Sequence, residues 1–262
     1  MPIDTLSLEG KTAIVTGSGR ENGIGAGIAK ALARNGASVV IHYVSDSSAN
    51  RAAGLVDSIK QSGGKAIAVQ AAVDTIMGAK EIVAKTLAGF GTQHIDILVN
   101  NAGTGNLVDI FGELHPEEID HVLHTNVNGP LYMVNSTIPY MPPGGRIINI
   151  SSTQSQLGGN VTITYAASKA AVDNLTWSLA KLLGRSKGIT VNSVSPGPVR
   201  TDLIPEELVD VILQPEIDLT LAADRAGEPE DIGDAVLLLV QEKARWITGQ
   251  NISLSGGVTR GR

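Results

Sequence analysis

Short apolar segments alternate with helix-forming segments along almost the whole chain. The apolar segments are four to six residues long, and their residues are apolar on consecutive positions. Such segments are typical of strands buried on both faces, and the helices between them are the crossovers that parallel strands require. The pattern therefore predicts one doubly wound α/β domain over residues 1–262, with a mostly parallel sheet of about seven strands and helices on both faces.

The apolar segments place seven strands, and the periodic segments place six helices. Strands are expected over residues 12–15, 38–41, 66–69, 95–99, 146–150, 189–194 and 251–254. Helices are expected over residues 24–35, 48–61, 77–90, 116–127 and 164–183, and a last one begins at Pro229. In open sheets of this kind, ligands bind outside the carboxyl ends of the strands. The loops that follow the strands are therefore the places to look for function.

Composition excludes several classes of function. The chain has no cysteine, which excludes disulfides, thiolate metal sites and a cysteine nucleophile, and its five histidines form no metal-binding set. A net charge of −6 argues against a nucleic-acid partner. The first eleven residues lack the apolar core of a signal peptide, and no stretch has the ~18 apolar residues of a membrane span. We expect a cytoplasmic protein without a membrane, metal or nucleic-acid partner.

A glycine-rich loop joins the first strand to the first helix. It begins at Thr16 and contains Gly17, Gly23 and Gly25. Glycines at this place let the backbone approach a pyrophosphate, whose charge is met by the N–H groups of the helix N-terminus. A flexible turn is the alternative interpretation. The preceding strand and the following helix favour dinucleotide binding.

The end of the second strand bears on which nicotinamide cofactor is bound. An acidic residue there would bind the ribose 2′-hydroxyl of NAD, but Tyr43 occupies that position. Arg20 in the glycine loop can pair with a 2′-phosphate, and Ser45 lies nearby. Glu21 and Asp46 argue the other way, and Arg20 as a solvated charge is the alternative. The pattern favours NADP(H).

A tyrosine and a lysine share one face of the expected helix 164–183. Tyr165 and Lys169 are four residues apart, and a lysine ammonium nearby lowers the pKa of a phenol. Ser152 follows the strand 146–150, where a hydroxyl can polarise a substrate carbonyl, and Asn126 ends a helix, where it can hold a water or orient the lysine. A serine turn and a helix-terminal asparagine are the structural alternatives. Together the four predict a proton-transfer site.

These motifs resemble one family when they are taken in order. The short-chain dehydrogenase/reductases share a glycine loop, an Asn-Ala-Gly turn, a serine, a Tyr-x-x-x-Lys pair and a Pro-Gly turn. The resemblance extends from Leu8 to Gly257, and the chain is similar to 3-oxoacyl-carrier-protein reductases and to fungal polyketide and naphthol reductases. The matching positions are Thr16, Gly17, Gly23, Gly25, Asn100, Asn101, Ala102, Gly103, Asn126, Ser152, Tyr165, Lys169, Pro196 and Gly197.

The resemblance implies a Rossmann-type oxidoreductase that reduces a ketone or other carbonyl with NADP(H), or oxidises the alcohol. Tyr165 would exchange the proton and Ser152 would hydrogen-bond the substrate oxygen. Lys169 would lower the pKa of Tyr165 and hold the ribose, while Asn126 would anchor a relay water. The implied cofactor contacts are Gly17, Ser18, Arg20, Asn22, Gly23, Ile24, Gly25, Tyr43, Ser45, Val73, Asn101, Ala102, Gly103, Tyr165, Lys169, Pro196, Gly197, Val199 and Thr201.

The glycine loop departs from the family pattern. Five residues separate Gly17 from Gly23, where the family has three. A second register that starts at Gly19 restores the spacing and makes Glu21 and Asn22 an altered loop entry. The two registers place the loop contacts at positions one or two residues apart.

Three further expectations concern substrate, assembly and a rival function. Residues 201–221 are apolar, interrupted by Pro205 and Pro215, and resemble the family's substrate lid; a helix pair packed on the core is the alternative. Small residues on the helix 164–183 suggest a homodimer or homotetramer, by analogy with the family. The rival function is a cofactor-sensing binding protein or a non-redox reaction on the same fold. The proton-transfer residues favour the enzyme.

Overall fold

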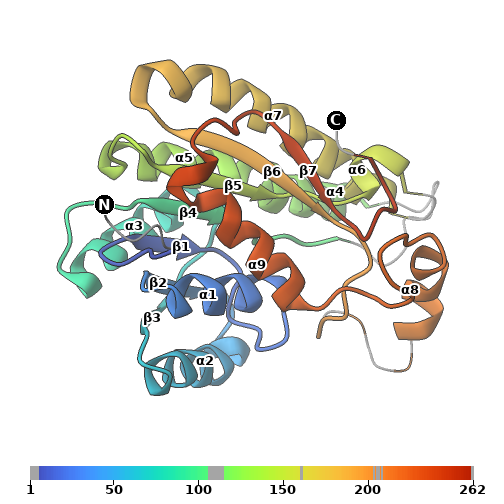
Figure 1. The fold of residues 1–262 in the computed structure, drawn as a ribbon, viewed down its shortest axis with the longest axis horizontal. Coiled ribbons are helices and arrows are strands. Elements are labelled where there is room, and N and C mark those ends of the chain that lie inside the picture. The colour runs from blue at the N-terminus through green and yellow to red at the C-terminus, as the bar shows by residue number, and fades with distance from the viewer. Residues whose placement is uncertain are drawn as a thin grey trace.

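A parallel sheet of seven strands forms the centre of the computed structural model, which describes residues 6–105, 115–159, 162–202, 204, 207 and 209–260. The strand order is β3-β2-β1-β4-β5-β6-β7, and every pairing is parallel (Figure 1). The doubly wound sheet expected from the sequence is confirmed. Its strands are β1 (Thr12–Val15), β2 (Ser38–Tyr43), β3 (Lys65–Gln70), β4 (Ile97–Asn100), β5 (Arg146–Ile150), β6 (Thr190–Pro196) and β7 (Asn251–Leu254).

Helices cover both faces of the sheet. One face carries α1 (Ile24–Arg34), α2 (Ala49–Gln61) and α9 (Pro229–Val240). The other carries α3 (Ile76–Phe90), α5 (Gly129–Thr137) and α7 (Ile163–Lys187). The other α-helices of the described residues are α4 (Pro116–Leu123), α6 (Gln154–Leu157) and α8 (Val209–Ile217).

The expected helix over residues 116–127 is wrong in its last turn. The α-helix ends at Leu123 and continues as a π-helical segment, His124–Asn128, which leads directly into α5. Helix α5 itself was not expected, because Gly129 and Pro130 suggest a break in the sequence. Here Pro130 occupies the first turn of α5, where the missing N–H does no harm.

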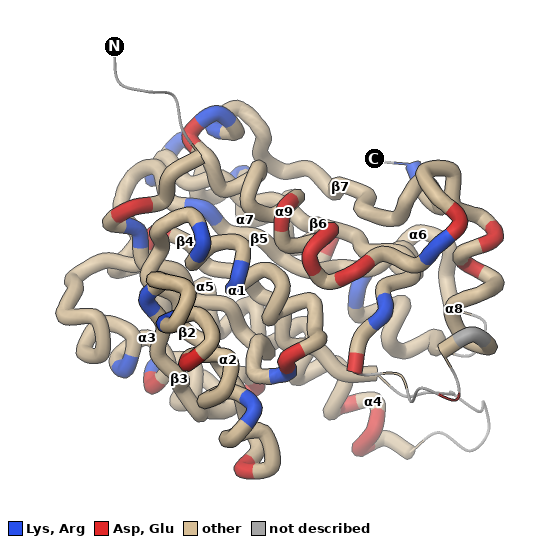
Figure 2. The backbone as a smooth tube through the Cα atoms, turned by 60° about the horizontal axis from the view of Figure 1, so that its bottom comes forward, with Lys and Arg blue, Asp and Glu red and all other residues tan. Residues whose placement is uncertain are grey.

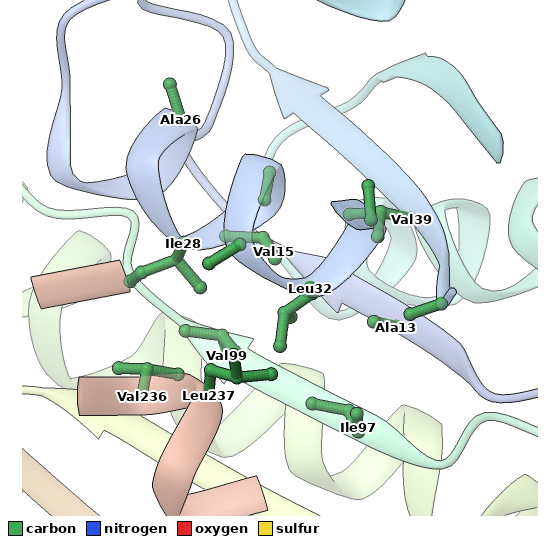
Figure 3. Close-up of a cluster of buried hydrophobic side chains, with 14 of the residues drawn as sticks. Ala13, Val15, Ala26, Ile28, Leu32, Val39, Ile97, Val99, Val236 and Leu237 are labelled. Atoms are coloured by element: carbon green, nitrogen blue, oxygen red, sulfur yellow. The ribbon is translucent and has the colours of Figure 1, made fainter. Parts of the chain in front are cut away.

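The core under α1 is built from aliphatic side chains of both layers. Ile28 and Leu32 of α1 pack with Val15 of β1, Val99 of β4 and Val236 of α9 (Figure 3). All five side chains are fully buried. At ~25 cal/mol per Å² of buried apolar surface, each stabilises the fold by roughly 1.5–3 kcal/mol. This core holds the helix that follows the glycine loop against the sheet.

The strand order reverses between β1 and β4. From β1 the chain proceeds outward to β2 and β3, whereas β4 begins the opposite half of the sheet. The connections on either side of such a point diverge and leave a crevice at the carboxyl edge. The glycine loop, the residues after β4 and the loops after β5 and β6 all meet at this edge. Helix α8 lies beyond it, at the right of Figure 1.

Charged residues are dispersed over the molecule. Lysine and arginine residues are interspersed with aspartate and glutamate residues along the tube in Figure 2. Within the described ranges, we find no helix with the length and apolar character needed to cross a membrane.

One buried histidine makes the stability depend on pH. His42 on β2 is fully buried, and burial lowers its pKa from 6.5 to about 4. Between these two pH values the unfolded chain binds a proton at His42 that the folded chain does not. The contribution of His42 to the free energy of unfolding is therefore fully present above pH 6.5 and is lost as the pH falls toward 4. We expect His42 to reduce the free energy of unfolding by about 2 kcal/mol between pH 7.5 and pH 5. Urea titrations at both pH values should show a smaller decrease for His42→Asn, and an equal decrease would contradict the assignment.

Candidate active site

The glycine loop is shaped by contacts that exclude a side chain. Gly17 has a left-handed φ of +65°, and a Cβ there would lie 2.7 Å from Cα of Ala102. A Cβ on Gly25 would lie 2.5 Å from Nδ2 of Asn101 and 2.9 Å from the Gly17 oxygen. A Cβ on Gly19 would lie 2.8 Å from Cβ of Tyr43. The loop is therefore tightly packed against β4 and β2, which disfavours the flexible-turn alternative.

The residues after β4 hold the start of the glycine loop. The Thr16 hydroxyl accepts hydrogen bonds from the backbone N–H groups of Asn101 and Ala102, each at 3.0 Å. The Asn101 side chain donates to the carbonyls of Thr16, at 2.8 Å, and Gly17, at 3.1 Å. These bonds join the carboxyl ends of β1 and β4, the two strands that flank the crevice.

The two additional loop residues lie in an exposed turn. The N–H of Gly23 donates to the carbonyl of Arg20 at 3.1 Å, and Gly23 is the N-cap of α1, whose first residue is Ile24. Asn22, inside this turn, donates from Nδ2 to Asp202 at 3.0 Å. The loop is therefore bound to the segment after β6. Asp202 was not among the expected site residues, and no sequence motif marks it.

The end of β2 carries no free acidic side chain. Tyr43 is half-buried there, and the Ser45 hydroxyl contacts the hydroxyls of Ser47 and Ser48. The nearby Asp46 accepts a hydrogen bond from the Gln70 side chain at 2.7 Å. Arg20 is exposed on the glycine loop. Val73, expected near the adenine, is buried after β3.

Tyr165, Ser152 and Lys169 form one cluster. Tyr165 and Lys169 lie one turn apart on α7, and the Lys169 ammonium is 5.4 Å from the centre of the tyrosine ring. The hydroxyls of Tyr165 and Ser152 are hydrogen-bonded, which lowers the pKa of Tyr165, although burial raises it more. The cluster brings a phenol, an aliphatic hydroxyl and a cation together.

The cation of the cluster is enclosed by protein. Lys169 is buried, and its Nζ donates to the carbonyl of Ile150 at 2.8 Å. Burial lowers the pKa of Lys169 from 10.5 to about 8, and the charge of Asp173 one turn further along α7 opposes that decrease. Asp173 is held by the hydroxyls of Ser155, at 2.6 Å, and Ser193, at 3.1 Å. Asp173 was not expected from the sequence, although its spacing of four from Lys169 is visible there.

Asn126 lies beside the cluster on the π-helical segment. Its Oδ1 accepts from the Thr104 N–H at 2.8 Å, and its Nδ2 donates to the Thr104 carbonyl and the Ser168 hydroxyl. A Cβ on Gly103 would lie 3.3 Å from both Asn126 Oδ1 and Lys169 Nζ. The turn after β4 thus bridges Asn126 and Lys169. The Asn126 amide is committed to these protein partners.

The turn after β6 borders the same crevice. The carbonyl of Pro196 accepts from the N–H of Thr153, next to Ser152, at 3.0 Å. A Cβ on Gly197 would lie 2.7 Å from Cβ of Ser255, and Val199, which precedes Thr201 by two residues, is buried. The turn is thereby packed between the loop after β5 and the loop after β7.

Helix α8 occupies much of the expected lid. Val209 and Leu213 are buried in a small cluster with Ala226, whereas Val211 is 72% exposed. Leu203, Pro205 and Leu208 lie outside the described residues. Pro215 lies inside α8 and does not end it. Both apolar surface and core packing are therefore present in residues 201–221.

Helix α8 also brings a carboxylate toward the cluster. The charge of Glu216 raises the pKa of Tyr165, and burial raises the pKa of Glu216 itself. A negative charge disfavours the phenolate, which keeps Tyr165 protonated. Nothing in the spacing of the sequence relates Glu216 to Tyr165.

Comparison with known proteins decides the family. The family model described as enoyl-(acyl carrier protein) reductase matches residues 17–259. The short-chain dehydrogenase/reductase FrzI of Cladobotryum sp is 38% identical over 257 residues, covering 96% of this chain and 97% of FrzI. This chain belongs to the short-chain dehydrogenase/reductase family. The resemblance inferred from the motifs is confirmed.

Two further short-chain dehydrogenase/reductase comparisons are informative. The hydroxynaphthalene reductase-like protein Arp2 of Metarhizium guizhouense is 37% identical over 267 residues, covering 96% of each chain. The crystal structure of angucycline C-6 ketoreductase LanV with bound NADP superposes with a TM-score of 0.86 at 36% identity, again covering 96% of each chain. The described chain therefore has the fold of an oxidoreductase family that includes a ketoreductase.

Proposed function

We propose that this short-chain dehydrogenase/reductase is an NADP(H)-dependent enzyme that reduces a ketone or other carbonyl to an alcohol, or catalyses the reverse reaction. The observation that carries the proposal is the hydrogen-bonded pair of Ser152 and Tyr165 with the buried Lys169 ammonium 5.4 Å from the tyrosine ring. A protein that only binds a cofactor has no need for this proton-transfer cluster.

The residues of the crevice fit a dinucleotide phosphate. Gly17 and Gly25 let the glycine loop pack directly on Asn101 and Ala102. Helix α1 begins at the end of this loop, with the N–H groups of its first turn at the crevice. Arg20 is exposed on the same loop, and Tyr43 stands where a carboxylate would select NAD. These features support NADP(H) over NAD. The LanV complex with NADP supports the same assignment by similarity.

Ser152, Tyr165 and Lys169 have different roles in the proposed proton transfer. When bound, the nicotinamide supplies or accepts the hydride at the carbonyl carbon. The Ser152 hydroxyl donates a hydrogen bond to the substrate oxygen as negative charge develops there. Tyr165 gives its phenolic proton to that oxygen in reduction, and the Lys169 ammonium stabilises the resulting phenolate. Asn126 positions this cluster through Thr104 and Ser168.

The proposed function extends to a substrate lid and to a homo-oligomer. We assign residues 201–221 as a substrate lid, supported by α8 at the carboxyl edge and by the effect of Glu216 on the pKa of Tyr165.

A homodimer or homotetramer is supported by the surface of α7, where Trp177 is 52% and Leu182 66% exposed. A cytoplasmic location remains a prediction from the sequence.

A screen of carbonyl compounds tests the proposed function. Cyclic and aromatic ketones, and the corresponding alcohols, are mixed with NADPH or NADH in parallel, and absorbance at the nicotinamide band is followed. We expect turnover with at least one ketone class and a preference for NADPH. Cofactor binding without turnover across the screen would favour the binding-protein alternative, and a preference for NADH would contradict the cofactor assignment.

Arg20 is expected to select the cofactor. In Arg20→Ala, the ratio of kcat/KM for NADPH to that for NADH should fall about 10-fold or more, because a charge-assisted bond to the 2′-phosphate is lost. Arg245→Ala is the matched control, since Arg245 precedes β7 and so lies at the amino edge of the sheet. An unchanged ratio in the Arg20 variant would identify this side chain as a solvated charge.

A further inference from the structure

A buried histidine lies directly beneath the glycine loop. His42 is on β2, at the strand position next to Tyr43, and its side chain is fully buried. None of the family motifs in the sequence includes it. Its imidazole nevertheless contacts the backbone of two different segments, the glycine loop after β1 and the segment after β3. This places one side chain between the cofactor loop and the outer half of the sheet.

The hydrogen bonds define the tautomer of His42. The N–H of Gly17 donates to Nδ1 at 2.9 Å, so Nδ1 carries no proton. Nε2 is 2.9 Å from the carbonyl of Ala71, which can only accept. The imidazole is therefore neutral with its proton on Nε2, and both nitrogens are satisfied.

The backbone of His42 binds the next two residues of the loop. Its carbonyl accepts from the N–H groups of Ser18, at 3.0 Å, and Gly19, at 3.1 Å. Its N–H donates to the Ser18 hydroxyl at 3.0 Å, and that hydroxyl donates to the Val15 carbonyl at 2.7 Å. Three consecutive loop N–H groups, those of Gly17, Ser18 and Gly19, are thus all directed to this one residue.

The imidazole of His42 supplies a hydrogen-bond acceptor that the backbone of the neighbouring strands does not supply. Gly17 has a left-handed φ of +65°, so the chain turns away from β1 and its N–H leaves the strand ladder. An N–H buried without an acceptor costs about 1–3 kcal/mol. The Nδ1 of His42 is that acceptor, and the Nε2 bond to Ala71 keeps the ring in the orientation that the acceptor needs.

We propose that His42 is a positioning residue for the cofactor loop: its Nδ1 accepts the Gly17 N–H and holds Gly17 against β2, so that the loop is already in the conformation that receives the cofactor diphosphate. This inference rests on the proposed function for the identity of the ligand. The hydrogen bond from the Gly17 N–H to His42 Nδ1, which we call the clamp, is a property of the protein alone. Without the clamp, the loop must be ordered when the cofactor binds, and that cost lowers the affinity.

Two substitutions separate the clamp from simple filling of the core. In His42→Asn, the amide oxygen lies close to the position of Nδ1 and still accepts from Gly17, while the bond to Ala71 is lost. In His42→Gln, the amide nitrogen lies close to the position of Nε2 and still donates to Ala71, while the acceptor for Gly17 is lost. Each variant removes one hydrogen bond and keeps a polar side chain in the cavity, so a merely structural role predicts similar effects for both.

The first measurement needs no cofactor. Hydrogen exchange of the peptide covering residues 16–25 is followed in the purified protein and both variants. We expect exchange at least 10-fold faster in His42→Gln than in His42→Asn, which should stay close to the wild type. Equal exchange in the two variants overturns the clamp, whatever the protein binds.

The second measurement tests the consequence for binding. The Kd for NADPH is determined by the fluorescence of the nicotinamide on titration with protein. We expect the Kd to increase at least fivefold in His42→Gln and less than twofold in His42→Asn. Equal Kd values in the variants overturn preorganisation by the clamp. Absence of NADPH binding by the wild type, with the exchange difference intact, would instead overturn the proposed function and the cofactor role while leaving the clamp established.

Discussion

Replacing Tyr165 with phenylalanine is expected to reduce ketone turnover by roughly 100-fold to 10,000-fold, the usual contribution of a positioned general acid or base. The substitution removes only the phenolic hydroxyl, so Ser152 and Lys169 remain in place but no group beside them can deliver the proton. Binding of NADPH should change little, because the ring still packs on α7. Turnover is measured by nicotinamide absorbance at saturating ketone, and binding by fluorescence titration.

Tyr140→Phe is the control for the tyrosine substitution. Tyr140 is 41% exposed, in a short helical turn after α5 at the amino edge of β5, away from the carboxyl-edge crevice. It should retain wild-type turnover. Undiminished turnover in the Tyr165 variant, with the control also active, would contradict the assignment of Tyr165 as the proton donor.

A single methyl group at Gly27 is expected to destabilise the fold by roughly 2–3 kcal/mol, as overpacking of a tight core does. Gly27 lies where α1 crosses α9, and a Cβ there would overlap the carbonyl of Pro229. A Cβ on Gly233 of α9 would in turn lie 2.5 Å from the Gly27 oxygen. Because both obstacles are backbone atoms, the helices must separate to admit the methyl group. Urea unfolding of Gly27→Ala measures the loss.

The matched control for Gly27 is another helical glycine. Gly54 lies on α2, and a Cβ there would meet nothing within 4 Å. Gly54→Ala should leave stability unchanged or raise it by about 0.5–1 kcal/mol, since alanine is the better helix former. Equal stability in the two alanine variants would show that the helix crossing tolerates a side chain.

Elements and motif positions were largely predictable from the sequence. The strand over residues 12–15 and the helix from Ile24 appear as expected, because each is specified by a local pattern of apolar residues. Tyr165 and Lys169 meet because a helix brings residues four apart to one face. Ser152 joins them because parallel strands end at one edge, which the alternation of strands and helices already implies.

The partners of the site residues were less predictable. Asn126 was expected to hold a water or orient the lysine, yet its amide bonds Thr104 and Ser168, from two other parts of the chain. Asn22, which is predicted to contact the cofactor, also bonds Asp202, which is 180 residues away in sequence. Such pairs carry no spacing that a single sequence reveals, because the distance along the chain between them is arbitrary.

The sequence by itself determined the doubly wound sheet, and it predicted the edge at which a ligand would bind and the four residues, Asn126, Ser152, Tyr165 and Lys169, that we propose for proton transfer. These features depend on the periodicity of apolar residues and on the order of the strand ends, and both can be read from the sequence. Only the tertiary structure decided that α8 brings the charge of Glu216 to Tyr165, and that His42 accepts the Gly17 N–H. Electrostatics and hydrogen bonds act through space over a few ångströms, so their partners are set by how the layers pack.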